Sequence, residues 1–161
     1  MADLLVRLYA LPPLGPALEA LAAGGIAVRR AAASERTPIV EWVRAHGSAG
    51  WADECAAAFA RQPIACFVAV EDAGGQTRLC GMACYDAACR NFFGPELVAP
   101  ECRRRGIGRA LLLAALHAIR ADGYAYAIIG WATAVDFYRS AVGATVIDCS
   151  TPGQYPRAFI R

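Results

Sequence analysis

The sequence has no apolar run long enough to cross a lipid bilayer, for which about 20 consecutive apolar residues are needed. Its hydrophobic content is high, at 57% with a mean hydropathy of +0.35, but much of it is alanine. A signal peptide is not expected either, because Asp3 comes early, the first basic residue is Arg7, and prolines at 12 and 13 interrupt the apolar run. We therefore expect neither a membrane anchor nor a secretion signal.

The sequence also lacks a C-x-x-C pair, and its seven cysteines are odd in number. Several of them fall in apolar, strand-like runs, where cysteine behaves as a small hydrophobic residue. Disulfides are rare in cytoplasmic proteins, and no metal-ligand spacing is present. We therefore expect reduced thiols in a cytoplasmic protein and no metal site.

Excess charge of one sign is lacking too, since 16 Lys and Arg residues stand against 14 Asp and Glu residues, a net charge of +2. A nucleic-acid-binding protein usually carries a strongly basic face, so this class is not favoured. We find no repeat, linker or low-complexity tract beyond the alanine bias. The 161 residues fit one domain with a substantial core. We expect residues 1–25 to be an N-terminal extension, a short strand and a helix, packed on a domain of residues 26–161.

What is present is an alternation of strand-like and helix-like segments. Strands are predicted at 4–10, 26–31, 64–70, 78–85, 91–98, 124–131 and 144–149, with a possible last strand at 155–160. Helices are predicted at 16–23, 37–46, 51–62, 110–122 and 134–141. The turn at 72–76 makes a hairpin of its two flanking strands. Pro95, inside a predicted strand, indicates a bulge or an unpaired stretch.

The most informative stretch is a basic, glycine-punctuated turn from Arg103 to Gly108, between a strand and a long apolar helix. Backbone N–H groups at a helix start have no helical partner and lie at the positive end of the helix dipole, which suits phosphate oxygens. Gly106 and Gly108 allow the backbone to approach a ligand closely. The alternative is a solvated basic surface at an ordinary helix start. A P-loop is excluded because no Gly-Lys-Ser/Thr follows, and a dinucleotide fingerprint because its glycine spacings are incomplete.

Three pieces of the sequence, in this order of elements, resemble the GNAT superfamily of acyl-CoA-dependent N-acetyltransferases. Residues 97–108 (LVAPECRRRGIG) look like that family's pyrophosphate-binding motif. Phe137-Tyr138, followed by Val142-Gly143-Ala144, is similar to its aromatic helix and the next glycine turn, and the helix and strand between these two pieces match as well. The resemblance covers about residues 26–147. It implies an α/β (α+β) fold with a mixed, mostly antiparallel central sheet flanked by helices on both faces.

The resemblance also implies an acetyl-CoA-dependent transfer of an acetyl group to a primary amine of a small molecule or protein, with coenzyme A as product. In this reading the backbone of residues 103–109 would hold the pyrophosphate, and Leu97 and Val98 would face the pantetheine arm. The implied cofactor-binding residues are Leu97, Val98, Arg103, Arg104, Arg105, Gly106, Ile107, Gly108, Arg109 and Phe137. The implied partner is a small-molecule or peptide amine, with no nucleic acid and no membrane, and a homodimer is possible. A non-catalytic acyl-CoA-binding sensor or interaction module on the same fold is the alternative.

Acyl transfer to an amine requires a neutral amine, a stabilised oxyanion and a proton for the departing thiolate. Tyr138 is the candidate proton donor, although it could simply pack in the core. Glu96 is the candidate base, because strand alternation places it on the same face as Val98. Asp86 or a chain of waters is the alternative base. The strand at 124–131 carries no carboxylate, so a base from that strand is excluded.

One departure from the family pattern concerns the aromatic helix. Tyr138 and Gly143 are five residues apart, where many members have four, so either Phe137 or Tyr138 could occupy the functional position. The other polar and aromatic candidates have simpler interpretations. We expect His117 on the surface, His46 at a helix end, and both Trp42 and Trp51 in the core.

Overall fold

The computed structural model describes residues 1–151 and 153, so the predicted strand at 155–160 lies outside the described residues. Seven strands form one sheet in the order β2-β3-β4-β5-β6-β1-β7. All neighbours are antiparallel except β5 and β6, which are parallel. The strands are β1 (Ala2–Arg7), β2 (Ile26–Arg30), β3 (Cys66–Asp72), β4 (Thr77–Tyr85), β5 (Phe92–Val98), β6 (Tyr126–Ala132) and β7 (Thr145–Val146). The predicted mixed, mostly antiparallel sheet is confirmed.

The first strand is an interior strand of this sheet. Leu4 of β1 lies opposite Ile129 of β6 on one side and opposite Val146 of β7 on the other. Both Leu4 and Val6 are fully buried. Residues 2–7 therefore share the sheet and the core with the rest of the chain.

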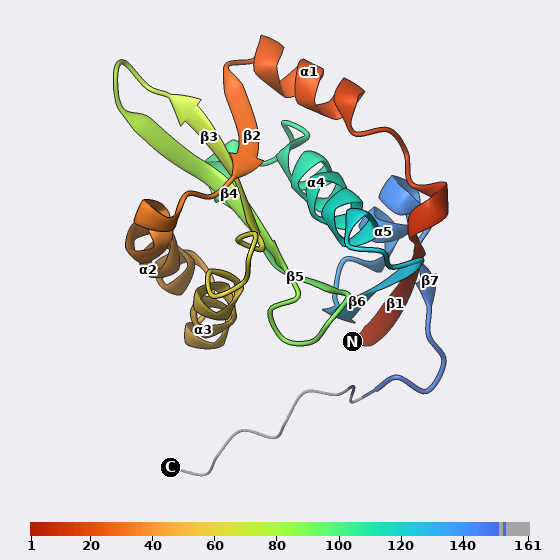
Figure 1. Ribbon diagram of the computed structural model, residues 1–161. Helices are drawn as coiled ribbons and strands as arrows, with labels where there is room; N and C mark the ends of the chain where they lie inside the picture. The colour runs from red at the N-terminus through yellow and green to blue at the C-terminus, as the bar shows by residue number, and fades with distance from the viewer. Residues whose placement is uncertain (152, 154–161) are drawn as a thin grey trace, which may run out of the picture.

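Helices cover both faces of the sheet (Figure 1). They are α1 (Gly15–Ala23), α2 (Arg36–His46), α3 (Ala49–Ala58), α4 (Ile107–Ala121) and α5 (Val135–Val142), with 3-10 turns η1 (Leu8–Ala10), η2 (Ala33–Glu35) and η3 (Pro100–Cys102). Helix α4 packs on β3, β4 and β5 beside α1, whereas α2 and α3 pack on each other and α3 on β4 and β5. None of the helices in the described part of the chain is long and apolar enough to cross a membrane.

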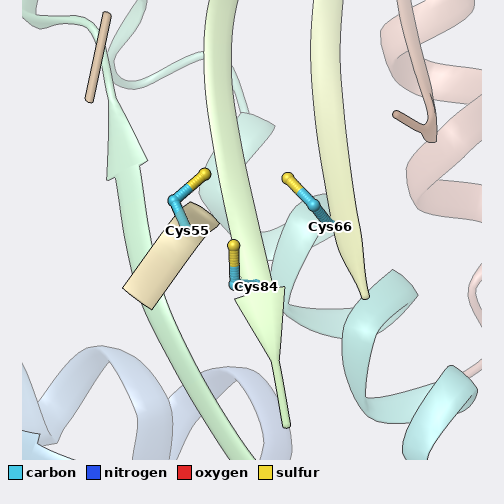
Figure 2. A group of neighbouring side chains, drawn as sticks. All are labelled: Cys55, Cys66 and Cys84. Carbon is cyan, nitrogen blue, oxygen red and sulfur yellow. The ribbon is translucent and has the colours of Figure 1, made fainter. Parts of the chain in front are cut away.

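Strand β4 separates α4 from α3. A Cβ at Gly81 would point at side chains of Ile107 and Leu111 in α4. Cys84, three residues further on, points to the opposite face, where its sulfur lies beside that of Cys55 in α3 (Figure 2). The two layers of helices thus bury the two faces of the same strand.

Four helices begin earlier than the sequence pattern predicts: α1 at Gly15, α2 at Arg36, α3 at Ala49 and α4 at Ile107. Before α2, the Glu35 carboxylate accepts the N–H of Ala32 at the start of η2 and pairs with Arg29 at 2.6 Å, but it makes no cap on α2 itself. Helix α3 begins at Ala49, because the Ser48 hydroxyl accepts the N–H of Trp51 at 3.1 Å. Among these four helices, only α3 has a side-chain cap at its start.

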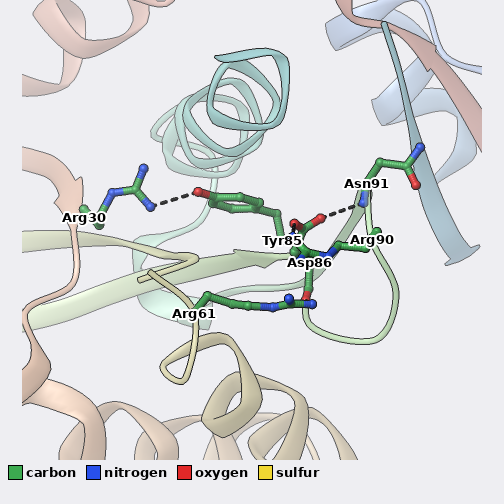
Figure 3. A network of polar contacts seen from close by, with 6 residues as sticks. All are labelled: Arg30, Arg61, Tyr85, Asp86, Arg90 and Asn91. Carbon is green, nitrogen blue, oxygen red and sulfur yellow. Dashed lines mark hydrogen bonds and ion pairs between the residues drawn. The ribbon is translucent and has the colours of Figure 1, made fainter. Parts of the chain in front are cut away.

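A polar network anchors the connection from β4 to β5 (Figure 3). The side-chain carboxylate of Asp86 accepts the N–H of Asn91 at 2.6 Å. The backbone carbonyl of Asp86 accepts a hydrogen bond from the Arg61 guanidinium at 2.8 Å. The neighbouring Tyr85 hydroxyl accepts a hydrogen bond from Arg30 at 3.0 Å. This network holds the start of β5 against β4 and so fixes where the following residues of β5 lie.

Candidate active site

The sheet opens between β5 and β6. The two strands pair at Phe92↔Ile128 and Phe93↔Ile129, and the register ends there. Pro95 cannot donate to a ladder, and the register of β5 with β4 shifts on the opposite side of this position. The break that Pro95 predicted is confirmed. The edge of β5 from Glu96 to Val98 therefore borders an opening instead of a neighbouring strand.

Two adjoining cavities meet at this break. The smaller, of about 550 Å³, lies at the start of α4, and the larger, of about 870 Å³, lies between β5, the end of β6 and the start of α3. Five residues line both cavities: Trp51, Glu96, Leu97, Ala134 and Tyr138. A molecule in one cavity can therefore reach a molecule in the other.

The smaller cavity is built on the first turn of α4. The helix ladder begins with the N–H of Ala110, which donates to the carbonyl of Gly106 at 3.1 Å, so the amides just before it lie at the positive end of the dipole. Gly106 has a φ of +84°, in the left-handed region that favours glycine. A Cβ at Gly108 would lie 3.3 Å from Oε1 of Glu96 and 3.7 Å from Cζ of Phe137. A side chain there would occupy part of the cavity.

All but one of the predicted cofactor-binding residues line this smaller cavity. The exception is Arg105, whose side chain pairs with Glu71 of β3 at 2.7 Å, while Arg78 pairs with the other oxygen of the same carboxylate. Among the three arginines that do line it, Arg103 also donates from Nε to the Val98 carbonyl at 3.3 Å. Arg105 can therefore contribute to the turn through its backbone only.

Glu96 and Tyr138 form the shared wall of the two cavities. The Tyr138 hydroxyl donates to Oε2 of Glu96 at 3.4 Å, whereas Oε1 of Glu96 is buried and has no hydrogen-bond partner in the described part of the chain. Burial raises the pKa of Glu96 to about 8, although the hydrogen bond from Tyr138 acts in the opposite direction. Burial, followed by the charge of Glu96, raises the pKa of Tyr138 far above its usual range. The phenol therefore stays protonated, while the carboxyl group can exchange a proton near neutral pH.

The two aromatic residues of α5 divide between the cavities. Phe137 lines the smaller cavity only, and Tyr138 lies beside Glu96 at the junction, with the two ring centroids 5.1 Å apart. The sequence left open which of the two occupies the functional position. The position next to a carboxylate belongs to Tyr138.

Several residues that line the larger cavity were not predicted from the sequence as site residues. Trp51 was expected in the core, but this interpretation is wrong, because its side chain is 41% exposed and lines both cavities. Glu54, one helical turn after Trp51, lines the larger cavity, and burial raises its pKa. Trp131, near the end of β6, lines it too. The spacing of Trp51 and Glu54, three residues apart on one helix face, was the signal available in the sequence.

Of the remaining candidates, Asp86 and His117 lie outside both cavities, whereas His46 does not. Asp86, the alternative base, does not line either cavity and is held by Asn91 in the β4–β5 connection. His117, expected on the surface, is half-buried, with Nε2 2.9 Å from the carbonyl oxygen of Pro12. His46 ends α2 as predicted and also lines the larger cavity. All seven cysteines are free in the structure.

The comparisons with known proteins agree with this geometry. Residues 62–141 match the family model of the Acetyltransferase (GNAT) domain. None of the curated proteins matches the chain. Among solved structures, it resembles the glucosamine N-acetyltransferase region of a fungal multi-domain GH3 β-N-acetylglucosaminidase, with a TM-score of 0.72 and 18% identity over 91% of this chain and 19% of that one.

A second similar structure is a GCN5-related N-acetyltransferase from Sphaerobacter thermophilus, with a TM-score of 0.64 and 21% identity over 91% of this chain and 48% of that one. The chain thus spans less than half the length of either protein. At these identities the likeness shows a shared fold. With the family match over the turn at 103–108 and helix α5, it leads to one conclusion: this chain carries an acetyltransferase domain of the GNAT family.

Proposed function

We propose that this protein transfers the acetyl group of acetyl-CoA to a primary amine. The observation that carries the proposal is the junction of the two cavities, where a protonated phenol and a carboxyl group of raised pKa lie side by side. An acyl donor in the smaller cavity and an amine in the larger one would meet at this junction.

The smaller cavity suits the diphosphate of coenzyme A. Its wall includes the start of α4 with Arg103, Arg104 and Arg109, and Gly108, which has no side chain. The helix dipole and the arginines favour negative charge, and the absence of a Cβ leaves space for it. When bound, acetyl-CoA would supply the activated acyl group as a thioester.

Glu96 and Tyr138 would divide the proton transfers. The amine must lose a proton to attack, and a carboxylate with a pKa of about 8 is a stronger base than an ordinary one. The thiolate must gain a proton, and the Tyr138 hydroxyl, which stays protonated, can donate it. The orphaned Oε1 of Glu96 is the atom available to the incoming ammonium group.

The larger cavity favours a cationic, apolar amine that carries no acidic group. Its wall contains the carboxylates of Glu54 and Glu96 and the indole rings of Trp51 and Trp131. The residues that line it in the described part of the chain include no arginine, and the sequence contains no lysine. A carboxylate or phosphate on the acceptor would therefore find no arginine or lysine partner, whereas an ammonium group near the indole rings gains cation–π attraction.

A matched amine panel tests both parts of the proposal. We would measure the loss of thioester absorbance with phenylethylamine, phenylalanine, glucosamine and glucosamine 6-phosphate, the sugars being included because of the fungal region named above. We expect kcat/KM for phenylethylamine to exceed that for phenylalanine at least tenfold, a difference of about 1.4 kcal/mol. A preference for the acid-bearing amine of each pair would refute the acceptor class and leave the transferase in place. Tight binding of acetyl-CoA with no turnover on any amine would instead favour the non-catalytic sensor.

Glu54→Gln provides the residue-level test of the acceptor class. It should raise KM for phenylethylamine by about tenfold while leaving the affinity for acetyl-CoA unchanged, because the smaller cavity does not include Glu54. Asp53→Asn is the control, since Asp53 is the preceding residue, is exposed, and pairs with Arg44 at 3.1 Å. Equal effects of the two variants would contradict a role for Glu54 in the cavity.

A further inference from the structure

Three buried thiols converge under α3, outside both cavities. Cys55 on α3, Cys66 on β3 and Cys84 on β4 place their sulfur atoms within 4.8 Å of one another (Figure 2). All three side chains are fully buried. Cys66 and Cys84 lie directly opposite each other on neighbouring strands, and Cys55 approaches them from the helix above.

The spacing of the three sulfurs suits a single bound ion. Two thiolates on one ion, with bonds of about 2.3 Å as in zinc sites, lie at most about 4.6 Å apart. Small side-chain rotations would therefore bring all three sulfurs into bonding range. Among the described residues no further His, Cys, Asp or Glu joins the group, whereas structural zinc sites take four ligands. The geometry favours an ion that is satisfied by three sulfurs.

We propose that Cys55, Cys66 and Cys84 form a binding site for a trivalent, thiophilic metalloid such as arsenic(III). Charge decides between this class and the divalent or monovalent soft metals. Three thiolates around a divalent ion leave one uncompensated negative charge, and around a monovalent ion they leave two. Around a trivalent ion the complex is neutral, which is the arrangement that a fully buried site tolerates best.

The binding step balances without an oxidant. Arsenous acid, As(OH)₃, is uncharged at neutral pH. It exchanges its three hydroxyl groups for three sulfurs, each S–H proton leaves with a hydroxyl group as water, and three As–S bonds form while three As–O bonds break. Where Cys55 is ionised, its partner hydroxyl leaves as hydroxide. No electrons are transferred, and arsenic stays trivalent.

Native mass spectrometry of the full chain with arsenite tests the site. The freshly reduced protein, freed of small thiols, is incubated with arsenite long enough for slow entry into the core. We expect a single adduct in which one arsenic replaces three hydrogens, together with a higher melting temperature. An adduct that retains a hydroxyl group and has lost two hydrogens would show a two-thiol site and overturn the proposal. So would the lack of an adduct, or a lower melting temperature.

A matched pair of variants identifies the ligands. Cys84→Ala should lose the three-sulfur adduct, whereas Cys80→Ala, which removes an equally buried sulfur from the same strand, should keep it. Cys55→Ala, on the helix, is the second test if Cys84→Ala fails to fold. Retention of the three-sulfur adduct in Cys84→Ala or Cys55→Ala, or its loss in a folded Cys80→Ala, would place the arsenic elsewhere and overturn the assignment.

Discussion

At the junction of the two cavities, Oε1 of Glu96 is buried without a hydrogen-bond partner among the described residues. Most buried polar atoms in proteins are satisfied, so such an atom calls for an explanation. A site that receives an ammonium group provides one, because the substrate itself would complete the hydrogen bonding. The same burial raises the pKa of Glu96 to about 8. A general base works best when its pKa lies near the pH of the reaction.

We predict that Tyr138→Phe lowers kcat by 10²–10⁴, about 3–5 kcal/mol of barrier, because it removes the transferable proton and keeps the ring. The affinity for acetyl-CoA, measured by calorimetry, should not change. Tyr126→Phe is the control, since Tyr126 is exposed and its hydroxyl lies 3.5 Å from that of Tyr9 instead of Glu96. Full turnover in Tyr138→Phe would assign the proton to water or to the acceptor ammonium.

The pH dependence of the reaction should report Glu96. Because the base must be ionised, kcat/KM should rise with pH and reach half of its maximum at about 8. Glu96→Gln should lower kcat/KM and remove this titration. The measurement is kcat/KM for phenylethylamine between about pH 6 and pH 9.5. A profile of the same shape in Glu96→Gln would show that another group titrates.

Glu96 should also make the folded state sensitive to pH. Its pKa is about 8 when folded, against an ordinary value of about 4.3, so the folded state binds the proton more tightly than the unfolded state. Its contribution to stability is therefore fully present below about pH 4 and is lost as pH rises toward about 8. Urea unfolding should show a smaller loss of stability over this window in Glu96→Gln than in wild type. Identical curves would contradict the raised pKa.

At the scale of elements, the start of α4 combines the dipole, the glycines and the arginines in one turn. This combination is local, which is why the spacing of residues 103–108 predicted it. The pairing of side chains depends instead on distant residues. Arg105 belongs to the same basic run, but its side chain pairs with Glu71, 34 residues earlier in the chain. A sequence motif thus indicates which backbone binds phosphate better than it indicates which side chains take part.

We predict that Gly108→Glu abolishes the calorimetric binding of acetyl-CoA. The new side chain would start 3.3 Å from Oε1 of Glu96 and place a negative charge in the cavity. Gly15→Glu is the matched control, because Gly15 begins α1 and a Cβ there meets no atom within 4 Å. Unchanged affinity in Gly108→Glu would refute the phosphate assignment of this turn.

At the scale of the whole molecule, the smaller cavity lies where α3, β5, α4 and α5 meet, so a ligand there contacts four elements of the fold. Ligand binding to the folded state should stabilise it by mass action. At a concentration of one hundred times Kd the gain is about 2.7 kcal/mol. For a chain of this size that corresponds to a rise in Tm of roughly 5–10 °C.

We predict this rise for wild type with acetyl-CoA in differential scanning calorimetry. The matched measurement is Gly108→Glu with the same ligand, in which Tm should stay constant. A wild-type Tm that does not respond to acetyl-CoA would contradict the proposed cofactor. A similar rise in both proteins would place the binding site elsewhere in the molecule.

The sequence by itself determined the features that depend on neighbouring residues. Hydrophobic periodicity and turn residues predicted the strands and helices, and the glycine spacing with Phe137-Tyr138 indicated the family. Pro95 predicted the break in the sheet, because a missing N–H is a property of one residue. The tertiary structure decided what depends on contacts between distant residues. Burial between β5, α4 and α5 raises the pKa of Glu96, and its partner Tyr138 is 42 residues away.

The same division explains the remaining differences. The sequence predicted an ordinary helix start at Trp51 and Glu54. In the structure both residues line the larger cavity, which lies where β5 and β6 separate. The sequence predicted Cys66 and Cys84 only as small core residues. In the structure, the antiparallel register of β3 and β4 places them opposite each other and next to Cys55. Register and layer packing are set by the sum of many contacts along the chain, so no short stretch of sequence contains them.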